Sequence, residues 1–158
     1  MTETASKDFS YHILLAEDSA ADVRLVRLAL RGQNFDHVLH VARDGEEAIA
    51  FIEKADQDPK APGPDLLLLD MHLPRYSGEE ILKRLRSTER YGQTPVIVMT
   101  SSAAPEDRDR AQKHAAVYYF RKPSCLDEFL QIGAIVRDIL TRNTRPGAEY
   151  PPIAGSDA

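Results

Sequence analysis

Cysteine is almost absent from this 158-residue sequence, which holds Cys125 alone. A single cysteine excludes an intrachain disulfide and gives no metal-ligand cluster. No apolar run approaches the roughly 20 residues that a membrane-spanning helix needs. Residues 1–10 form a polar leader without the apolar core of a signal peptide. We therefore expect a protein that acts in the cytoplasm and does not contact a membrane.

The sequence also has no excess of basic residues. Lysine and arginine number 20 against 25 aspartates and glutamates, giving a formal net charge of −5. This balance argues against sequence-independent binding to nucleic acid or to an anionic membrane. The chain has no Gly-x-Ser-x-Gly segment, so nucleophilic serine chemistry has no support. Its length suffices for one domain with a substantial core.

The chain is organised around four consecutive leucines that end in an acidic residue, in the stretch Pro-Asp-Leu-Leu-Leu-Leu-Asp-Met-His-Leu-Pro over residues 64–74. So short an apolar run between turn residues is typical of a central parallel strand buried on both faces. Asp70 follows this strand directly. In open α/β sheets, the binding crevice lies at the carboxyl ends of the strands. Asp70 is therefore the first candidate for a functional residue.

Short apolar runs alternate with helical patterns along the whole chain. Strands are expected at 11–16, 37–42, 66–69, 96–99 and 117–120, and a helical pattern follows each of them. Five strand–helix units in a row predict a parallel sheet with helices on both faces and right-handed crossovers. We expect a domain over residues 11–142, followed by a disordered tail at 143–158, where Pro, Gly and Ala prevail.

The last two predicted helices stand out. The helix at 105–115 is the most polar one, and its weak hydrophobic anchoring predicts a mobile element. The helix at 124–142 carries a full apolar stripe, with Ile132, Ile135 and Ile139 beside it. One face packed on a sheet needs only about 100° of apolar arc. The additional isoleucines therefore predict contact with another protein surface.

Polar residues follow four of the predicted strands: Glu17-Asp18, Asp70, Thr100 and Lys122. Carboxyl ends of parallel strands share one edge of the sheet, so these side chains are expected to converge. Three ionised carboxylates need a cation to balance them, and oxygen ligands suit Mg²⁺. A divalent ion beside a hydroxyl and a lysine can bind a phosphoryl group. Asp70 would then act as the nucleophile and form an aspartyl phosphate.

This set of residues, with its spacing, resembles the receiver domain of two-component response regulators. The acidic pair after the first strand, Asp-Met-His-Leu-Pro…Gly after the third, Thr-Ser after the fourth and Lys-Pro after the fifth carry the resemblance over residues 12–140. The resemblance implies a flavodoxin-like (βα)₅ doubly wound fold with strand order 2-1-3-4-5. It also implies a signalling phosphoacceptor rather than an enzyme.

The roles of the site residues follow from this resemblance. Asp70 corresponds to the phosphoacceptor, and Glu17 and Asp18 to the acidic pair that holds Mg²⁺. The backbone carbonyl of His72 corresponds to the third protein ligand, whereas its imidazole is expected to flank the site. Lys122 corresponds to the residue that pairs with the phosphoryl oxygens. The phosphoryl donor would be a sensor histidine kinase.

Two further residues resemble the family's switch pair. Thr100 is expected to turn its hydroxyl towards the phosphoryl group, and Tyr119 to rotate inward with it. The alternatives are that Thr100 caps the next helix and that Tyr119 is an ordinary half-buried strand residue. The family's peptide bond after the lysine, here Lys122–Pro123, is usually cis. The glycine often found after the fourth helix is Ala115 here, so an unusual turn is expected.

A narrower resemblance concerns the small regulators that serve phytochrome-type photoreceptor kinases. It rests on Glu-Asp-Ser-Ala-Ala-Asp-Val-Arg-Leu at 17–25, a proline-rich loop at 57–64 and the lack of an output domain after Leu140. Such regulators often form homodimers through their last strands and helices, in agreement with the additional isoleucines. The downstream partner is not indicated.

Two other functions compete with the phosphorylated switch. An aspartate-dependent phosphohydrolase needs a carboxylate two residues after its nucleophile, and His72 occupies that position. A receiver-like interaction module without phosphate chemistry would not need the complete set of site residues, which is Glu17, Asp18, Asp70, Thr100 and Lys122. The phosphorylation-independent module is kept as the alternative function.

Overall fold

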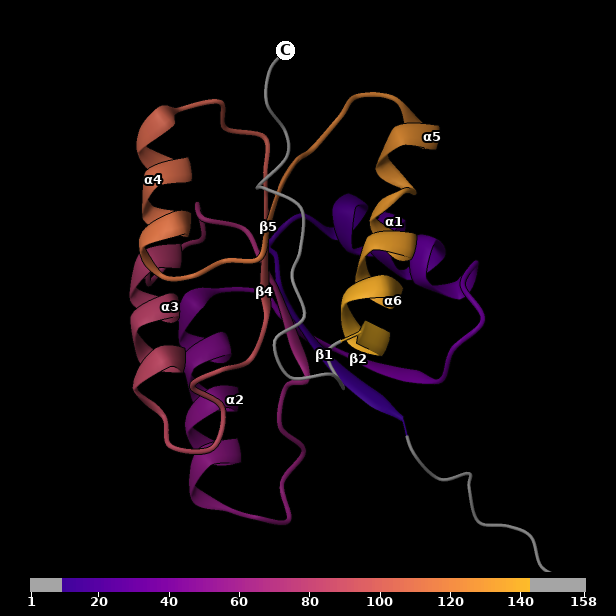
Figure 1. The fold of residues 1–158 in the computed structure, drawn as a ribbon. Helices are drawn as coiled ribbons and strands as arrows, with labels where there is room; N and C mark the ends of the chain where they lie inside the picture. Colours follow the sequence, from indigo (N-terminus) through magenta and orange to yellow (C-terminus); the bar gives the residue numbers. More distant parts are fainter. Residues whose placement is uncertain (1–9, 143–158) are drawn as a thin grey trace, which may run out of the picture.

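The computed structural model describes residues 10–142, in which a parallel five-stranded sheet lies between two layers of helices (Figure 1). The sheet has the order β2-β1-β3-β4-β5, and all of its strand pairs are parallel. The predicted topology is therefore confirmed. The strands are β1 (Tyr11–Ala16), β2 (His37–Ala42), β3 (Leu66–Leu69), β4 (Val96–Thr100) and β5 (Tyr118–Arg121).

The helices begin where the sequence provides capping side chains. Ser19 accepts a hydrogen bond from the third helical N–H of α1, Asp44 does the same for α2, and Ser77 forms a reciprocal capping box with Glu80 in α3. These caps satisfy N–H groups that the helix itself leaves without partners. The helices are α1 (Ala20–Arg31), α2 (Gly45–Gln57), α3 (Gly78–Ser87), α4 (Pro105–Lys113), α5 (Leu126–Phe129) and α6 (Ile132–Arg142).

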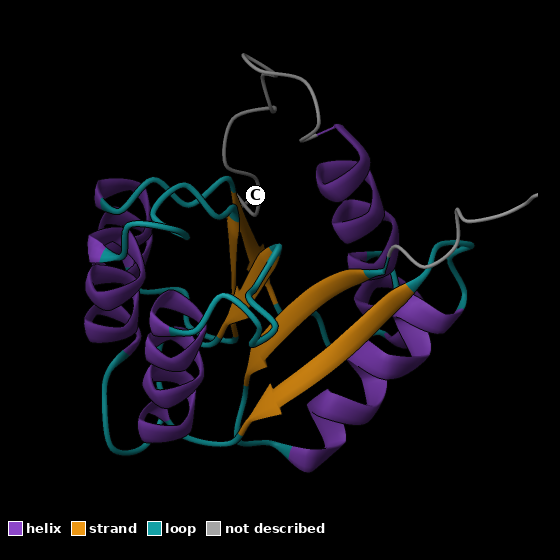
Figure 2. Ribbon diagram, turned by 90° about the horizontal axis from the view of Figure 1, so that it is seen from below, coloured by secondary structure: helices purple, strands orange, loops and turns teal. Residues whose placement is uncertain are grey.

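The two faces of the sheet are covered by different helices. In Figure 1, α2, α3 and α4 lie on one side of the strands, and α1, α5 and α6 lie on the other. Figure 2 shows the same layers along another direction, with the strands between the helices. None of the helices within residues 10–142 is long and apolar enough to cross a membrane.

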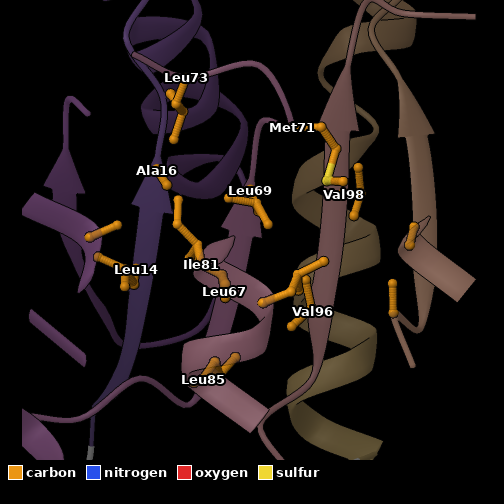
Figure 3. Close-up of a cluster of buried hydrophobic side chains, with 14 of the residues drawn as sticks. Leu14, Ala16, Leu67, Leu69, Met71, Leu73, Ile81, Leu85, Val96 and Val98 are labelled. Atoms are coloured by element: carbon orange, nitrogen blue, oxygen red, sulfur yellow. The ribbon is translucent and has the colours of Figure 1, made fainter. Parts of the chain in front are cut away.

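The leucine strand is the centre of the core, as the sequence predicts. All four residues of β3 are fully buried because helices cover both faces of this central strand. Leu67 and Leu69 point to the α2–α3–α4 face, where Leu14, Ile81 and Val98 pack with them (Figure 3). Leu66 and Leu68 belong to the cluster on the opposite face. The strand thereby holds Asp70 at the end of the most buried part of the sheet.

The predicted single helix at 124–142 is wrong in detail. The chain forms the short helix α5, passes through a turn at residues 130–131 and continues as α6. Helix α6 packs against α1 as well as against the sheet, and a Cβ on Gly133 would clash with the backbone of Ala29. A helix with two such neighbours buries a wider apolar arc than a helix on a sheet alone.

This packing corrects the prediction that three isoleucines form an exposed partner face. Ile132 is fully buried and Ile139 is 4% exposed, and both belong to the cluster that includes Val26 and Leu30 of α1. Ile135 alone is half-buried. The additional apolar arc is therefore used largely within the molecule, against α1. Residues 1–9 of the expected leader and the tail at 143–158, with its expected disorder, lie outside the described residues.

Candidate functional site

The sheet itself positions the residues that follow its strands. In three cases the backbone hydrogen-bonding pattern continues one residue beyond the strand and fixes the Cα atom from which a polar side chain starts. The three hydrogen bonds run from Glu17 N to Ala42 O at 2.9 Å, from Asp70 N to Ala16 O at 3.1 Å, and from Lys122 N to Thr100 O at 2.8 Å. The predicted convergence at one edge follows from this register.

Three carboxylates form the acidic part of the site. Glu17, Asp18 and Asp70 each offer one oxygen, and these oxygens lie within 4.8 Å of one another. Glu17 is 1% exposed and Asp70 is 8% exposed, whereas Asp18 faces solvent. The group combines two nearly buried oxygen donors with one that lies open to water.

Lys122 joins this acidic group from the end of β5. Its Nζ lies 2.6 Å from Glu17, 3.2 Å from Asp70 and 2.8 Å from Asp22. The first two contacts agree with the predicted site. Asp22, in the first turn of α1, was missed by the sequence analysis although it lies within the quoted 17–25 motif. Its only sequence signal was an acidic residue one helical turn after the Glu17–Asp18 pair.

Burial and charge act in opposite directions on the two most enclosed groups. Burial raises the pKa of the Glu17 carboxyl, and hydrogen bonds from Lys122 and the Ser19 backbone offset this only in part. Burial by itself would lower the pKa of Lys122, but hydrogen bonds to Asp22 and Glu17 and the charge of Asp70 raise it above its ordinary value. The lysine is therefore held as an ammonium.

The arrangement fits a hard divalent cation. Glu17, Asp18, Asp22 and Asp70 bring four negative charges and Lys122 brings one positive charge, so the fully ionised cluster carries −3. The charge of Asp70 adds a small contribution to the raised pKa of Glu17, of which burial is the main cause. The three clustered carboxylates of Glu17, Asp18 and Asp70 offer oxygen ligands, and Asp18 is open to water. Such ligands suit Mg²⁺.

Thr100 and Tyr119 lie beside the site and meet at Ser102. The Thr100 Oγ1 accepts a hydrogen bond from the Ser102 backbone N–H at 3.1 Å, and the Tyr119 hydroxyl donates to the Ser102 carbonyl at 3.3 Å. Both side chains are buried. The Arg108 guanidinium stacks over the Tyr119 ring, 4.9 Å from its centre. Their coupled movement stays a prediction.

His72 flanks the site, as expected for its imidazole. Its backbone N–H donates to Asp70 Oδ1 at 3.0 Å, and its side chain is 60% exposed. The ring turns away to Asp107 of α4, with Nε2 lying 2.6 Å from the carboxylate. The role of its carbonyl as a third ligand stays a prediction. Asp107, which is 2% exposed, was also missed, because nothing in so polar a helix indicates which acid points inward.

The peptide bond between Lys122 and Pro123 corrects an expectation of the resemblance. All peptide bonds in the described part of the chain are trans, this one included. The Lys122 side chain nevertheless reaches Glu17 and Asp70, since the backbone bond to Thr100 already sets its direction.

Comparison with known proteins agrees with this geometry. The response regulator receiver domain family matches residues 13–133. Response regulator Rcp1 of Synechocystis sp. is 34% identical over 137 residues, which cover 86% of this chain and 93% of Rcp1.

Two solved structures are similar over most of the chain. The Mn²⁺-bound form of Rcp1 has a TM-score of 0.74 and 31% identity, covering 89% of this chain and 99% of Rcp1. The phosphorylated cyanobacterial phytochrome response regulator RcpA has a TM-score of 0.76 and 29% identity, covering 90% and 99%. With the acidic group and Lys122 at the carboxyl edge of a 2-1-3-4-5 sheet, these matches show that the chain belongs to the response regulator receiver domains, which are signalling phosphoacceptors rather than enzymes.

Proposed function

We propose that this protein is a phosphorylation-dependent switch in which Asp70 accepts a phosphoryl group from a sensor histidine kinase. The observation that carries the proposal is the position of the Asp70 carboxylate, 3.2 Å from the Lys122 ammonium and next to Glu17 and Asp18. A carboxylate nucleophile needs its attacking oxygen free of a proton and a positive charge where the phosphoryl oxygens arrive. Lys122 provides that charge.

The proposed reaction transfers the phosphoryl group from an imidazole nitrogen of the kinase to Asp70. An oxygen lone pair of Asp70 forms the new P–O bond, and the P–N bond breaks with its electron pair returning to the imidazole. Lys122 neutralises one of the phosphoryl oxygens. The His72 backbone N–H, at 3.0 Å from Asp70 Oδ1, keeps the carboxylate oriented. No proton has to leave Asp70 during this step.

Mg²⁺ is the proposed cofactor. Glu17, Asp18 and Asp70 would hold it, together with the His72 carbonyl that the family resemblance implies. When bound, the ion offsets the charge of the carboxylates and of the incoming phosphoryl oxygens. The Mn²⁺-bound structure of the similar regulator Rcp1 supports a divalent ion at this fold.

Intact mass measurement after incubation with acetyl phosphate and Mg²⁺ tests the proposal directly. We expect one phosphoryl adduct in the native protein and none in Asp70→Asn or without Mg²⁺. An adduct that persists in Asp70→Asn would show that another residue is the acceptor. A native protein that takes no adduct would favour the phosphorylation-independent module.

For the partner, we propose a phytochrome-type histidine kinase. The support is the similarity to RcpA, described as a phytochrome response regulator, and to the bacteriophytochrome response regulator RtBRR at 25% identity and a TM-score of 0.67. Phosphoryl transfer from a panel of autophosphorylated kinases tests this pairing. Faster labelling of Asp70 by a bacteriophytochrome than by kinases with other sensors is the expected result. Equal rates would contradict it.

A homodimer through the last strand and helices remains part of the proposal in a reduced form. With Ile132 and Ile139 in the core, the apolar surface left for contact includes Leu126, which is 51% exposed, and the half-buried Tyr118, Leu130 and Ile135. Light-scattering mass with and without beryllofluoride, a phosphoryl mimic, tests it. A monomeric mass under both conditions would contradict the dimer.

A further inference from the structure

Lys122 has three acidic partners, and one of them differs from the other two. Glu17 and Asp70 belong to the group whose oxygens lie close enough to share a cation, whereas Asp22 does not. Asp22 nevertheless makes a contact of 2.8 Å, shorter than the 3.2 Å between Lys122 and Asp70. Asp22 is therefore the one observed acidic partner of Lys122 that is not needed as a cation ligand.

The local structure of α1 leaves the Asp22 carboxylate available for this contact. Ser19 is the N-cap, and its hydroxyl accepts the hydrogen bond from the Asp22 backbone N–H. The Asp22 side chain thus does not cap the helix, although its negative charge is favourable beside the positive end of the helix dipole. It is 24% exposed, so it is shielded in part from solvent. The helix start fixes the backbone of Asp22, and the carboxylate points to Lys122.

We propose that Asp22 is a positioning residue, which holds the Lys122 ammonium beside Asp70 when a cation and a phosphoryl group engage the oxygens of Glu17 and Asp70. This inference rests on the proposed function and adds a residue to it. A lysine side chain has several rotatable bonds and loses considerable entropy when it is held in one place. A second anchor outside the cation group keeps Lys122 directed at the phosphoryl oxygens.

The positioning role and a plain charge effect predict opposite changes in the affinity of the site for an anion. Removal of a negative charge near an anion site strengthens anion binding when electrostatics alone acts. Loss of a positioning contact weakens anion binding, because Lys122 is no longer held in place. The two effects oppose each other, so the direction of the change in affinity reports which of them dominates.

The experiment measures the affinity of the full chain for beryllofluoride in the presence of Mg²⁺, by ¹⁹F NMR. We expect Asp22→Ala to weaken binding about tenfold, the range for losing one hydrogen bond to a charged group. Asp22→Asn keeps an oxygen acceptor for Nζ and should lose less. Unchanged or tighter binding in Asp22→Ala would overturn the proposal.

Two controls separate positioning from a general loss of structure. Asp36→Ala removes an equal charge from an exposed residue between α1 and β2 and should leave the affinity unchanged. In a Lys122→Gln background there is no ammonium to position, so Asp22→Ala should no longer weaken binding. Equal weakening in both backgrounds would mean that Asp22 supports the helix and not the lysine. Urea unfolding of each variant checks that it folds.

The same measurements keep this proposal separate from the proposed function. If the native protein binds no beryllofluoride, or if Asp70→Asn binds it equally well, the phosphoacceptor function fails. If the native protein binds it through Asp70 and Asp22→Ala binds it as tightly, only the role of Asp22 fails.

Discussion

The His72 imidazole and the Asp107 carboxylate lie 2.6 Å apart and join the loop that follows Asp70 to helix α4. Helix α4 buries only Asp107 and Ala111, so apolar packing contributes little to holding it in place. The hydrogen bond from His72, an ion pair with Arg110 at 3.2 Å and a hydrogen bond with Ser102 surround the Asp107 carboxylate. A polar contact therefore anchors the helix that the sequence marks as mobile.

We expect Asp107→Ala to lower the free energy of unfolding by about 1–3 kcal/mol, because it leaves buried polar partners unsatisfied. Hydrogen exchange of the α4 amides should accelerate more than that of α3. Asp109→Ala is the matched control, since Asp109 is exposed on the same helix. Equal exchange in the two variants would contradict the anchoring role of Asp107.

The Arg86 side chain connects three segments through backbone carbonyls. Its guanidinium donates to the carbonyls of His114 at 2.9 Å, Gly92 at 3.1 Å, Thr94 at 2.6 Å and Ala115 at 3.2 Å. Ala115 has φ 62°, a left-handed conformation that an alanine adopts rarely. The unusual turn expected at this position is thus present, and Arg86 binds its carbonyl.

Arg86→Leu should destabilise the protein by about 3 kcal/mol, because four carbonyls lose a charged donor. Arg84→Leu, on the same helix, removes an exposed ion pair with Glu53 and should change stability by less than about 1 kcal/mol. Urea unfolding of the two variants provides the comparison. A similar loss in both would show that the carbonyl contacts of Arg86 add nothing.

The pair of His12 and His40 predicts a loss of stability in mild acid. Their ring nitrogens lie 2.9 Å apart, and burial first, then the charge of His12, lowers the pKa of His40. Between the lowered pKa of His40 in the folded protein and the unfolded value of about 6.5, the unfolded chain binds more protons than the folded chain. The free energy of unfolding therefore rises with pH over this interval. The contribution is present above that value and is lost as the pH falls through the folded pKa.

His40→Gln should therefore flatten the dependence of unfolding free energy on pH between about 7.5 and 5.5. The measurement is urea unfolding at a series of pH values. His37→Gln, a change on the same strand outside the pair, should keep the native slope. If His40→Gln kept the pH dependence of the native protein, the lowered pKa of His40 would not be its cause.

Cation binding should stabilise the native protein through the acidic group. Mg²⁺ at about tenfold its Kd adds roughly 1.4 kcal/mol to the free energy of unfolding. Asp18→Asn should lose most of this gain, because it removes the negative charge of one of the three clustered carboxylates. Thermal unfolding with Mg²⁺, compared with NaCl at equal ionic strength, measures this stabilisation. Asp109→Asn is the control variant and should keep it. Undiminished stabilisation of Asp18→Asn would place the ion elsewhere.

What the sequence alone determined about this protein is the sheet and the residues at its edge. Four leucines between turn residues are typical of a strand buried on both faces, and a polar residue that follows such a strand lies where parallel strands end. Glu17, Asp18, Asp70 and Lys122 could be predicted in this way, since the strand register alone brings them together.

Tertiary structure decided which side chains meet beyond that edge. Asp22 and Asp107 are two acids among the 25 acidic residues of the chain, and only the placement of α1 and α4 directs them to Lys122 and His72. The burial of Ile132 and Ile139 depends likewise on α1 packing beside α6. Local patterns report the period of a helix and the face it buries, whereas the neighbour that covers the remaining arc is set by the packing of distant elements.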